Sequence, residues 1–541
     1  MKGKQKPGVL FQPQVHHCLQ RGIHQMVSAI RPTLGPLGGG VVIDHLYDTK
    51  PLPEFIEDAG VIARRIIELQ DRDADVGAML VRSMLIRQHE RLGDGTATTA
   101  VLFEAIFNGG LKYIAAGGNA MQFRKHLEHA LPHLLDAIDA MTFPLEGRAA
   151  LTNMAHSLCH DAELADFMGE SFDLLGEYGR LALREGYGRR LLKEYVEGSY
   201  FYAGAVARSL LPEDAEATLR LENAAIFLCD HTVTEYQTLF PVLQAANSAN
   251  VSALVIVARD LSEKAVSLLH AHNRLNRFPV IAVKLPGLNA DDRVAALDDL
   301  SLMTGATPIL AVIGATFENV SARDFGIVRR FWASTHEFGF VGGRSDPRKL
   351  RTHVQKLKAR ARKVLDVDER KKLHDRIGAL LGGSLTLWLG GYSEPEIKMR
   401  KALAERTALA MRAALEEGVV PGGGIALLNC RQVLADQIGA DADERAAYRV
   451  LIEALEAPAR TIFQNAGCDP GDIMGRLLYA DVNAAYDVMT DKVVDARTAG
   501  IVDSVSVLKA GLRNAISTAA LALTIDSVVH LSHPEMVGEP G

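Results

Sequence analysis

The sequence of 541 residues has little cysteine, little tryptophan and no long apolar run. It contains 5 cysteines and 2 tryptophans, and aromatic residues make up 6% of the chain. The cysteines are scattered, odd in number and never spaced as C-x-x-C, so we expect free thiols and a reducing, cytoplasmic location. No apolar run approaches the roughly 18 residues that span a bilayer, and the first 14 residues lack the apolar segment of a signal peptide. We therefore expect no membrane partner.

The sequence also lacks an excess of positive charge. Its 59 Lys and Arg residues are outnumbered by 66 Asp and Glu residues, for a net charge of -7. Domains that bind nucleic acid normally carry a basic excess, so nucleic acid is not an expected partner. The dense run of Lys and Arg at 348–376 has interleaved Leu, Val and Ala, which is typical of solvated amphipathic helices. No G-K-[ST] motif with P-loop spacing occurs, which disfavours a P-loop enzyme.

The residue pattern is helical towards both ends of the chain and mixed in the middle. Apolar residues at intervals of three and four predict a helix over 15–30. In the middle, amphipathic stretches separate short apolar runs at 224–228, 253–257 and 280–283. This alternation predicts βαβ units with a partly parallel sheet. A helix is predicted again from about 397 to 417, and the length of the chain suits about three domains.

A glycine-rich turn between two predicted helices is the first candidate for a ligand site. It reads Gly93-Asp94-Gly95-Thr96-Ala97-Thr98 and opens the second helix. Glycine lets a backbone approach a ligand closely, and a helix N-terminus offers free N–H groups to phosphates. Asp94 could hold a Mg²⁺ ion that bridges phosphate oxygens. An Asp helix cap followed by a glycine turn explains the same residues equally well.

Four ordered motifs resemble those of the GroEL-type (group I, 60 kDa) chaperonins. They are T-L-G-P at 33–36 with V-V-I-D at 41–44, G-D-G-T-A-T-T-A-V-L at 93–102, E-E-G-V-V-P-G-G-G at 416–424 and G-I-V-D at 500–503. The motifs lie in the family's order, and a weaker likeness continues through the middle of the chain. The sequence is therefore identified as a divergent member of this family.

The resemblance implies a multidomain α and α/β fold. A helical equatorial domain would combine residues 1–140 and 417–541. A small intermediate domain would combine 141–196 and 385–416, and the α/β apical domain would be 197–384. Periodicity alone does not pair the two ends of the chain.

The resemblance also implies an ATP and Mg²⁺ site, with Asp94 as the metal ligand. The residues that would contact the nucleotide are Thr33, Leu34, Gly35, Pro36, Asp94, Gly95, Thr96, Thr98, Gly422, Gly423, Asp487 and Asp503. The implied function is an ATP-binding chaperonin subunit that assists folding of non-native polypeptides in a homo-oligomeric ring. A double heptamer and a co-chaperonin lid belong to the same expectation. Arg460 and Asp469 keep the charge signs of a contact between two rings.

One departure from the family bears directly on catalysis. The family's hydrolytic Asp position is Arg406, and a guanidinium cannot act as a general base. The adjacent Glu405 points roughly 100° away on a helix. Arg406 could instead pair with phosphates, which would favour binding without turnover. Asp58 lies in a segment that has lost a lysine and whose register is ambiguous, and Met489 would narrow the adenine pocket. The alternative function is therefore a hydrolysis-deficient holdase or ring scaffold that binds proteins without ATP turnover.

The sequence also offers candidates for a client-binding surface, a metal site and a different enzyme. The positions that present apolar side chains to clients are Leu210, Phe240, Leu243 and Val266, and at helical spacing these residues could equally face a core. His156, Cys159 and His160 share one helix face, but no second helix supplies obvious partners for a metal. A different enzyme built on the middle domain is disfavoured, because that segment has no G-x-G-x-x-G motif after a strand.

Overall fold

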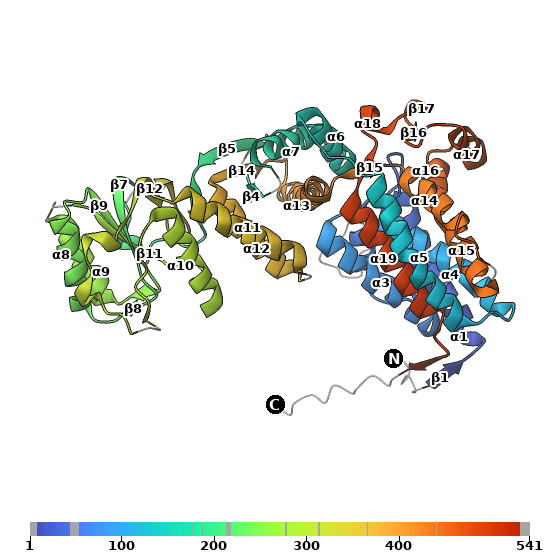
Figure 1. Ribbon diagram of the computed structural model, residues 1–541, viewed down its shortest axis with the longest axis horizontal. Helices are drawn as coiled ribbons and strands as arrows, with labels where there is room; N and C mark the ends of the chain where they lie inside the picture. Colours follow the sequence, from blue (N-terminus) through green and yellow to red (C-terminus); the bar gives the residue numbers. More distant parts are fainter. Residues whose placement is uncertain are drawn as a thin grey trace. The chain divides into compact units, whose positions relative to one another are not determined.

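The computed structural model describes residues 8–43, 54–176, 178–186, 188–212, 218–275, 278–311, 314–364, 366–439 and 441–530 (Figure 1). The chain forms two compact units. Unit 1 combines residues 1–173 with residues 398–541, and unit 2 is the intervening segment 174–397. The two ends of the chain thus share one unit. The finer division into equatorial, intermediate and apical domains stays a prediction.

Unit 1 is mainly helical, as the periodicity predicts. Its longer helices are α1 (Gln14–Ile30), α3 (Arg72–Leu92), α4 (Thr96–Ala115), α5 (Ala120–Ala140), α6 (Arg148–Cys159), α14 (Ile425–Ala435), α15 (Ala442–Ala454) and α19 (Val505–Ala522). The shorter ones are α2 (Ala59–Arg65), α16 (Ala457–Asn465), α17 (Pro470–Leu478) and α18 (Ala496–Ala499), while α7 (Ala162–Leu175) and α13 (Glu394–Glu417) cross the boundary between the units. Helices α4, α5 and α19 pack together around a core that includes Phe103, Phe107 and Leu512.

The described part of unit 1 also contains four two-stranded antiparallel sheets. They pair β1 (Gly8–Phe11) with β19 (Ser527–His530), β2 (Val41–Ile43) with β3 (Glu54–Ile56), β15 (Val419–Pro421) with β18 (Val502–Ser504), and β16 (Ala484–Asp487) with β17 (Lys492–Asp495). The first and third pairs join segments from distant parts of the sequence. In particular, β15 and β18 bring the 416–424 and 500–503 motifs side by side.

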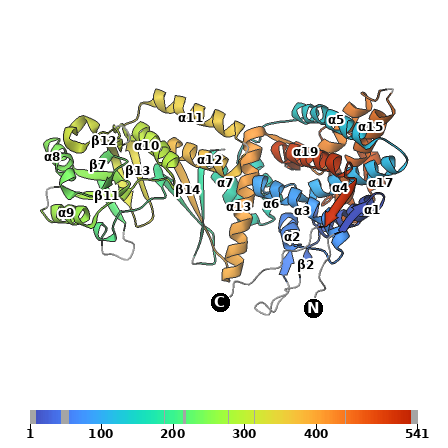
Figure 2. The ribbon, with the colours of Figure 1, turned by 90° about the horizontal axis from the view of Figure 1, so that it is seen from below.

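Unit 2 contains a six-stranded sheet in the order β11-β9-β7-β12-β13-β6. Its strands are β6 (Ser199–Phe201), β7 (Leu219–Leu228), β9 (Ala253–Ala258), β11 (Val280–Lys284), β12 (Gly326–Ala333) and β13 (Phe338–Gly343). The three strands predicted from apolar runs, β7, β9 and β11, are parallel, while β12, β13 and β6 are antiparallel to their neighbours. A partly parallel sheet is therefore confirmed. Helices α8 (Phe240–Ser248) and α9 (Glu263–Arg274) lie near its parallel strands in both views (Figure 2).

The described remainder of unit 2 includes a smaller sheet, a short strand pair and helices α10 to α12. The sheet has the order β4 (Arg180–Glu185), β14 (Gly383–Leu389), β5 (Leu192–Glu197), with β14 parallel to β4 and antiparallel to β5. A short parallel pair joins β8 (Thr232–Val233) to β10 (Asp260–Leu261). Helices α10 (Ala290–Thr304), α11 (Pro347–Lys363) and α12 (Val367–Leu381) follow, and the last two are the predicted helix pair of the basic run.

The cysteines and the helix lengths agree with the composition. All five cysteines are free, as predicted. Among the described residues, no helix combines the length and the apolar character that crossing a bilayer requires.

Two glycines set the separation of α1 and α3. A Cβ on Gly22 would lie 1.7 Å from the carbonyl oxygen of Ala74, and one on Gly77 would lie 2.3 Å from that of Leu19. Both neighbours are backbone atoms, so a side chain at either position would push the helices apart. The spacing of these two helices matters for the site, because each leads directly into one wall of it.

We expect Gly77→Ala to lower the free energy of unfolding of unit 1 by about 1–3 kcal/mol, since overpacking against backbone cannot relax. Gly475 in α17 is a matched control, because no atom lies within 4 Å of the position that its Cβ would take. Gly475→Ala should stabilise α17 slightly, because alanine favours a helix more than glycine does. Thermal and denaturant unfolding of both variants measures the difference, and equal effects of the two substitutions would contradict it.

Candidate functional site

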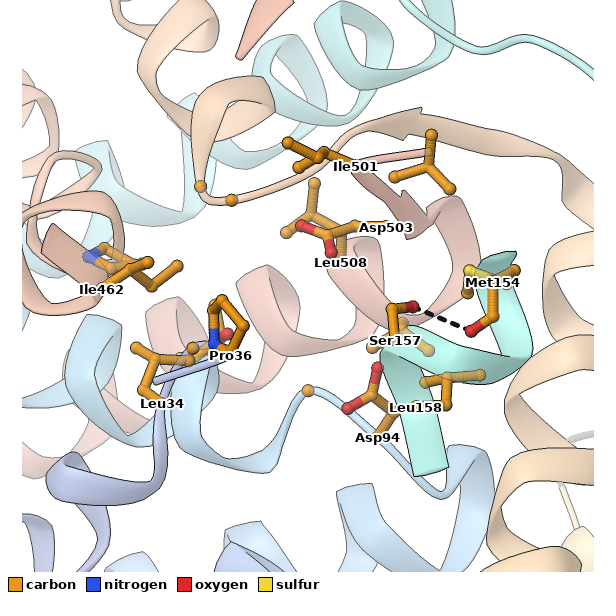
Figure 3. Close-up of a pocket in the computed structure, with 18 of the residues that line it drawn as sticks. Leu34, Pro36, Asp94, Met154, Ser157, Leu158, Ile462, Ile501, Asp503 and Leu508 are labelled. Atoms are coloured by element: carbon orange, nitrogen blue, oxygen red, sulfur yellow. Dashed lines mark hydrogen bonds between the residues drawn. The ribbon is translucent and has the colours of Figure 1, made fainter. Parts of the chain in front are cut away.

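A cavity of about 530 Å³ opens within unit 1 (Figure 3). This is a typical size for a small-molecule site. Nine of the predicted nucleotide residues line it: Leu34, Gly35, Pro36, Asp94, Gly95, Thr98, Gly423, Asp487 and Asp503. The structure thus brings together residues from four separate motifs.

The other three predicted residues stand directly behind the wall. The hydroxyl of Thr33 donates to the carbonyl oxygen of Ile30 at 2.8 Å, which closes the end of α1. The Gly422 N–H donates to the carbonyl oxygen of Ile501 at 2.8 Å. Thr96 is buried as the first residue of α4. These three residues lie behind the ones that line the cavity and help to set its shape.

The wall formed by residues 34–36 is held by a side chain that sequence reasoning missed. Asn465 at the end of α16 donates its amide to the carbonyl oxygens of Arg31 and Leu34, at 2.9 and 2.8 Å. Gly35 adopts a left-handed conformation with φ of 97° and packs against Ile462. A glycine is needed here because other residues rarely adopt such a φ.

The glycine-rich turn forms the opposite wall. Gly93 and Gly95 flank Asp94 and are both left-handed, with φ of 71° and 75°. The buried Gln88 holds this turn: its amide donates to the carbonyl oxygens of Asp94 and Val507, at 3.4 and 3.3 Å. The turn is therefore tied to α19 as well as to its own two helices.

Helix α4 begins at this turn without a side-chain cap. Its first N–H groups are the free donors of an uncapped helix end. The Thr96 hydroxyl at the same end is buried and has no hydrogen-bond partner in the part of the chain that the structure describes. Buried polar atoms are rarely left unsatisfied, so this end of α4 is suited to an anionic ligand.

Asp503 enters the cavity from the opposite side. It is the middle residue of β18, paired in register with Val420 of β15. Its carboxylate and that of Asp94 both project into the cavity (Figure 3). Burial, together with the charge of Asp94, raises the pKa of Asp503 to about 7. Burial also raises the pKa of Asp94, against the opposing influence of the Gly95 N–H, His89 and His160.

These features fit a magnesium-bound nucleotide. Two carboxylates that have no ion-pair partner among the described residues call for a cation, and Mg²⁺ commonly binds through one or two carboxylates and phosphate oxygens. No group of three or more His, Cys, Asp or Glu suited to a metal occurs among the described residues. A metal at Asp94 would therefore depend on oxygens from its ligand. The uncapped end of α4 would bind the phosphates.

Arg406 does not line the cavity. Its guanidinium forms an ion pair with the Asp58 carboxylate and donates to the carbonyl oxygen of Leu158 at 3.4 Å. Asp58 also caps α2, accepting from the N–H groups of Gly60 and Val61 at 2.7 and 2.9 Å. Burial lowers the pKa of Arg406. The free guanidinium that phosphate binding would require is thus engaged with Asp58, and Glu405 is exposed on α13 outside the cavity lining.

The end of the cavity predicted to bind the adenine is apolar apart from Asp487. Pro458, Ile462, Val488 and Met489 contribute to this lining. The carboxylate of Asp487 accepts from the Met489 N–H at 2.9 Å and from the Thr490 hydroxyl at 2.6 Å. Met489 lines the cavity with 66% of its surface exposed, so it covers the opening more than it fills the interior.

A third wall comes from α6 and was not expected from the sequence. It contributes Asn153, His156, Ser157 and His160. The sequence had singled out His156 and His160 for a metal with Cys159, but Cys159 is buried and its thiol donates to the carbonyl oxygen of Asp161. The i, i+4 spacing of the two histidines indicated a shared helix face, and the fold shows that this face lines the cavity.

The four residues predicted to bind clients lie in unit 2 and differ in exposure. Leu210 and Leu243 belong to its core, with 6% and 8% of their surfaces exposed. Val266 is partly buried against that core, whereas Phe240 at the start of α8 is 47% exposed. Burial favours a core role for the first two, and client binding stays a prediction centred on Phe240 and Val266.

The two residues predicted at a ring contact both have partners within unit 1. Arg460 pairs with Glu456 at 2.7 Å on the same helix. Asp469 caps α17 by accepting from the Gly471 N–H at 2.8 Å. The ring contact stays a prediction.

The raised pKa of Asp503 makes the stability of unit 1 depend on pH. Because its folded pKa of about 7 exceeds the unfolded value, stability should fall as pH rises from about 4 to 7. Asp503→Asn should therefore raise the free energy of unfolding at pH 8, by on the order of 2 kcal/mol, and change it little at pH 4.

Asp495 provides a control of opposite sign for this measurement. Hydrogen bonds from Thr498 lower its pKa, so Asp495→Asn should reduce stability at pH 8. Unfolding transitions of the wild type, Asp503→Asn and Asp495→Asn at several pH values test the two expectations. An unchanged Asp503→Asn profile would contradict the burial of this carboxylate.

Comparison with known proteins agrees with this architecture. A sequence model of the TCP-1/cpn60 chaperonin family matches residues 26–533. The solved structures that resemble the chain include the chaperonin gp146 from the Pseudomonas aeruginosa bacteriophage EL, in two crystal forms in the presence of ATP-BeFx. These superpose with TM-scores of 0.71 and 0.64 at 17% and 18% identity, and each match covers 97% of this chain and 99% of gp146. The GroEL-like fold is confirmed, and the chain belongs to the TCP-1/cpn60 chaperonin family.

Proposed function

We propose that this chain is an ATP-binding chaperonin subunit that assists the folding of non-native proteins within a homo-oligomeric ring in the cytoplasm. Family membership supports the chaperone role. Nucleotide binding would shift the ring between states of different affinity for clients.

The observation that carries the nucleotide proposal is the pairing of two carboxylates with an uncapped helix end. Asp94 and Asp503 face one cavity, and α4 begins beside it without a side-chain cap. Mg²⁺ between the carboxylates and phosphates on α4 would neutralise the carboxylates and give the N–H groups of the helix end acceptors. When bound, the metal would neutralise charge on the phosphates.

The ion pair of Arg406 with Asp58 favours the second candidate, a ring that binds nucleotide and proteins without turnover. Hydrolysis needs a group that orients or deprotonates water. The cation at position 406 cannot do so, and its partner Asp58 is held by that cation and by α2. Neither of these two charged residues lines the cavity.

We expect the purified oligomer to bind Mg²⁺-ATP and to hydrolyse it at a rate near background, because Arg406 occupies the position of the family's hydrolytic aspartate. Asp94→Asn should weaken Mg²⁺-dependent binding at least tenfold, whereas Asp298→Asn on the exposed face of α10 should leave it unchanged. Calorimetry measures nucleotide binding by each protein, and steady-state phosphate release measures hydrolysis. Appreciable turnover that disappears in Glu405→Gln would identify Glu405 as the missing base and overturn the second candidate.

Arg406→Asp tests the role of the ion pair. The change places a carboxylate against Asp58, so unit 1 should lose about 1–3 kcal/mol of stability without Mg²⁺. Mg²⁺-ATP should restore the loss, and phosphate release should rise at least tenfold. If the variant binds nucleotide and turnover stays at background, the defect extends beyond position 406. Thermal unfolding with and without Mg²⁺-ATP, alongside phosphate release, separates these outcomes.

A further inference from the structure

Among the described residues, the wall of the cavity carries no permanent positive charge. None of the described residues that line it is Lys or Arg, and its acidic members are Asp94, Asp487 and Asp503. The nearby cation Arg406 is bound to Asp58. A phosphate chain keeps net negative charge even with one Mg²⁺, so binding here would bring like charges together. The uncapped end of α4 offers only a partial positive charge, so a further cationic group would strengthen binding.

Of these described lining residues, the ones that can become cations are His156 on α6 and His160 at the C-cap of that helix. They lie one turn apart, on the same wall as the exposed side of Ser157. The Ser157 hydroxyl donates to the carbonyl oxygen of Met154 at 2.8 Å, so its proton is already engaged (Figure 3). The side-chain N–H donors that this wall offers to a ligand are therefore the two imidazoles and the amide of Asn153, and of these the imidazoles can also gain a positive charge.

The end of α6 is shaped to present His160. Its backbone is left-handed with φ of 52°, an uncommon conformation outside glycine, and its N–H donates to the carbonyl oxygen of His156 at 2.9 Å. Its side chain is exposed, and it is near enough to Asp94 to act on that carboxyl electrostatically. The residue that follows, Asp161, is engaged by Arg400 at 2.7 Å and does not compete for the imidazole.

We propose that His156 and His160 bind the phosphate end of the nucleotide as imidazolium cations, so that nucleotide binding by this chain is coupled to proton uptake. The inference rests on the proposed nucleotide function. An imidazole titrates near neutral pH and gains a proton readily beside an anion. The titratable groups that line the same cavity are Asp94 from the α3–α4 turn, Asp503 from β18 and Asp487 from β16. Behind Asp94, His89 contacts Asp58 at 3.6 Å.

The acidic groups act in the opposite direction. Metal binding at Asp94 and Asp503 favours their charged forms and releases protons, so the two contributions must be measured apart. Calorimetry in buffers of different ionisation enthalpy, between pH 6 and pH 8.5, counts the protons exchanged with ADP. The measurement is made with Mg²⁺ and again with EDTA, which removes the metal-linked release.

The test variant is His156→Gln/His160→Asn, in which Asn tolerates the left-handed backbone. His336→Gln, at an exposed turn of unit 2, is the matched control. We expect the double variant to bind ADP at least tenfold more weakly than wild type at pH 6.5, to match it at pH 8.5 and to take up fewer protons. His156→Lys supplies a fixed cation on a helix and should bind about tenfold more tightly than wild type at pH 8.5.

Two results would overturn the inference while leaving the nucleotide site intact. Equal pH profiles of wild type and double variant would show that the imidazoles do not carry the charge. An equal loss at every pH would show that they act by shape alone. If wild type binds no nucleotide at any pH, the proposed function itself fails, and this inference fails with it.

Discussion

The site depends on the cost of holding two carboxylates, Asp94 and Asp503, in one poorly hydrated cavity. Among the described residues neither has a permanent counter-charge in the cavity wall, and the charge of Asp94 makes Asp503 harder to ionise. Such a pair persists only where the surrounding structure fixes it. Here the β15–β18 ladder fixes Asp503, and Gln88 with the close crossing of α1 and α3 fixes the turn that carries Asp94.

Much of this framework follows from residue patterns. Apolar periodicity gives α1, the break at residues 93–95 and the parallel strands β7, β9 and β11, because each is a local property of the chain. The union of the two chain ends in unit 1 is not local. It follows from the family motifs, which carry information that no periodicity contains.

The remaining details depend on contacts between distant residues. The sequence marks Arg406 as a departure but cannot show that Asp58 neutralises it. It marks His156 and His160 as a helix-face pair but cannot show which cavity they adjoin. No sequence pattern marks Asn465 or Gln88, because their role comes from the distant backbone carbonyl oxygens to which they donate hydrogen bonds. In unit 2, helical spacing groups Leu243 with its neighbours but does not say which face is covered, and burial decides that Leu243 packs inward.

The ion pair between Arg406 and Asp58 has a consequence for the history of the chain. Each charge is tolerable only while its partner remains, since loss of one leaves the other uncompensated close to Asp94. A change to an acidic residue at position 406 would thus lower the stability of the nucleotide-free chain, even where it raises turnover. Substitutions at the two positions are epistatic, and we expect them to covary among descendants of this sequence.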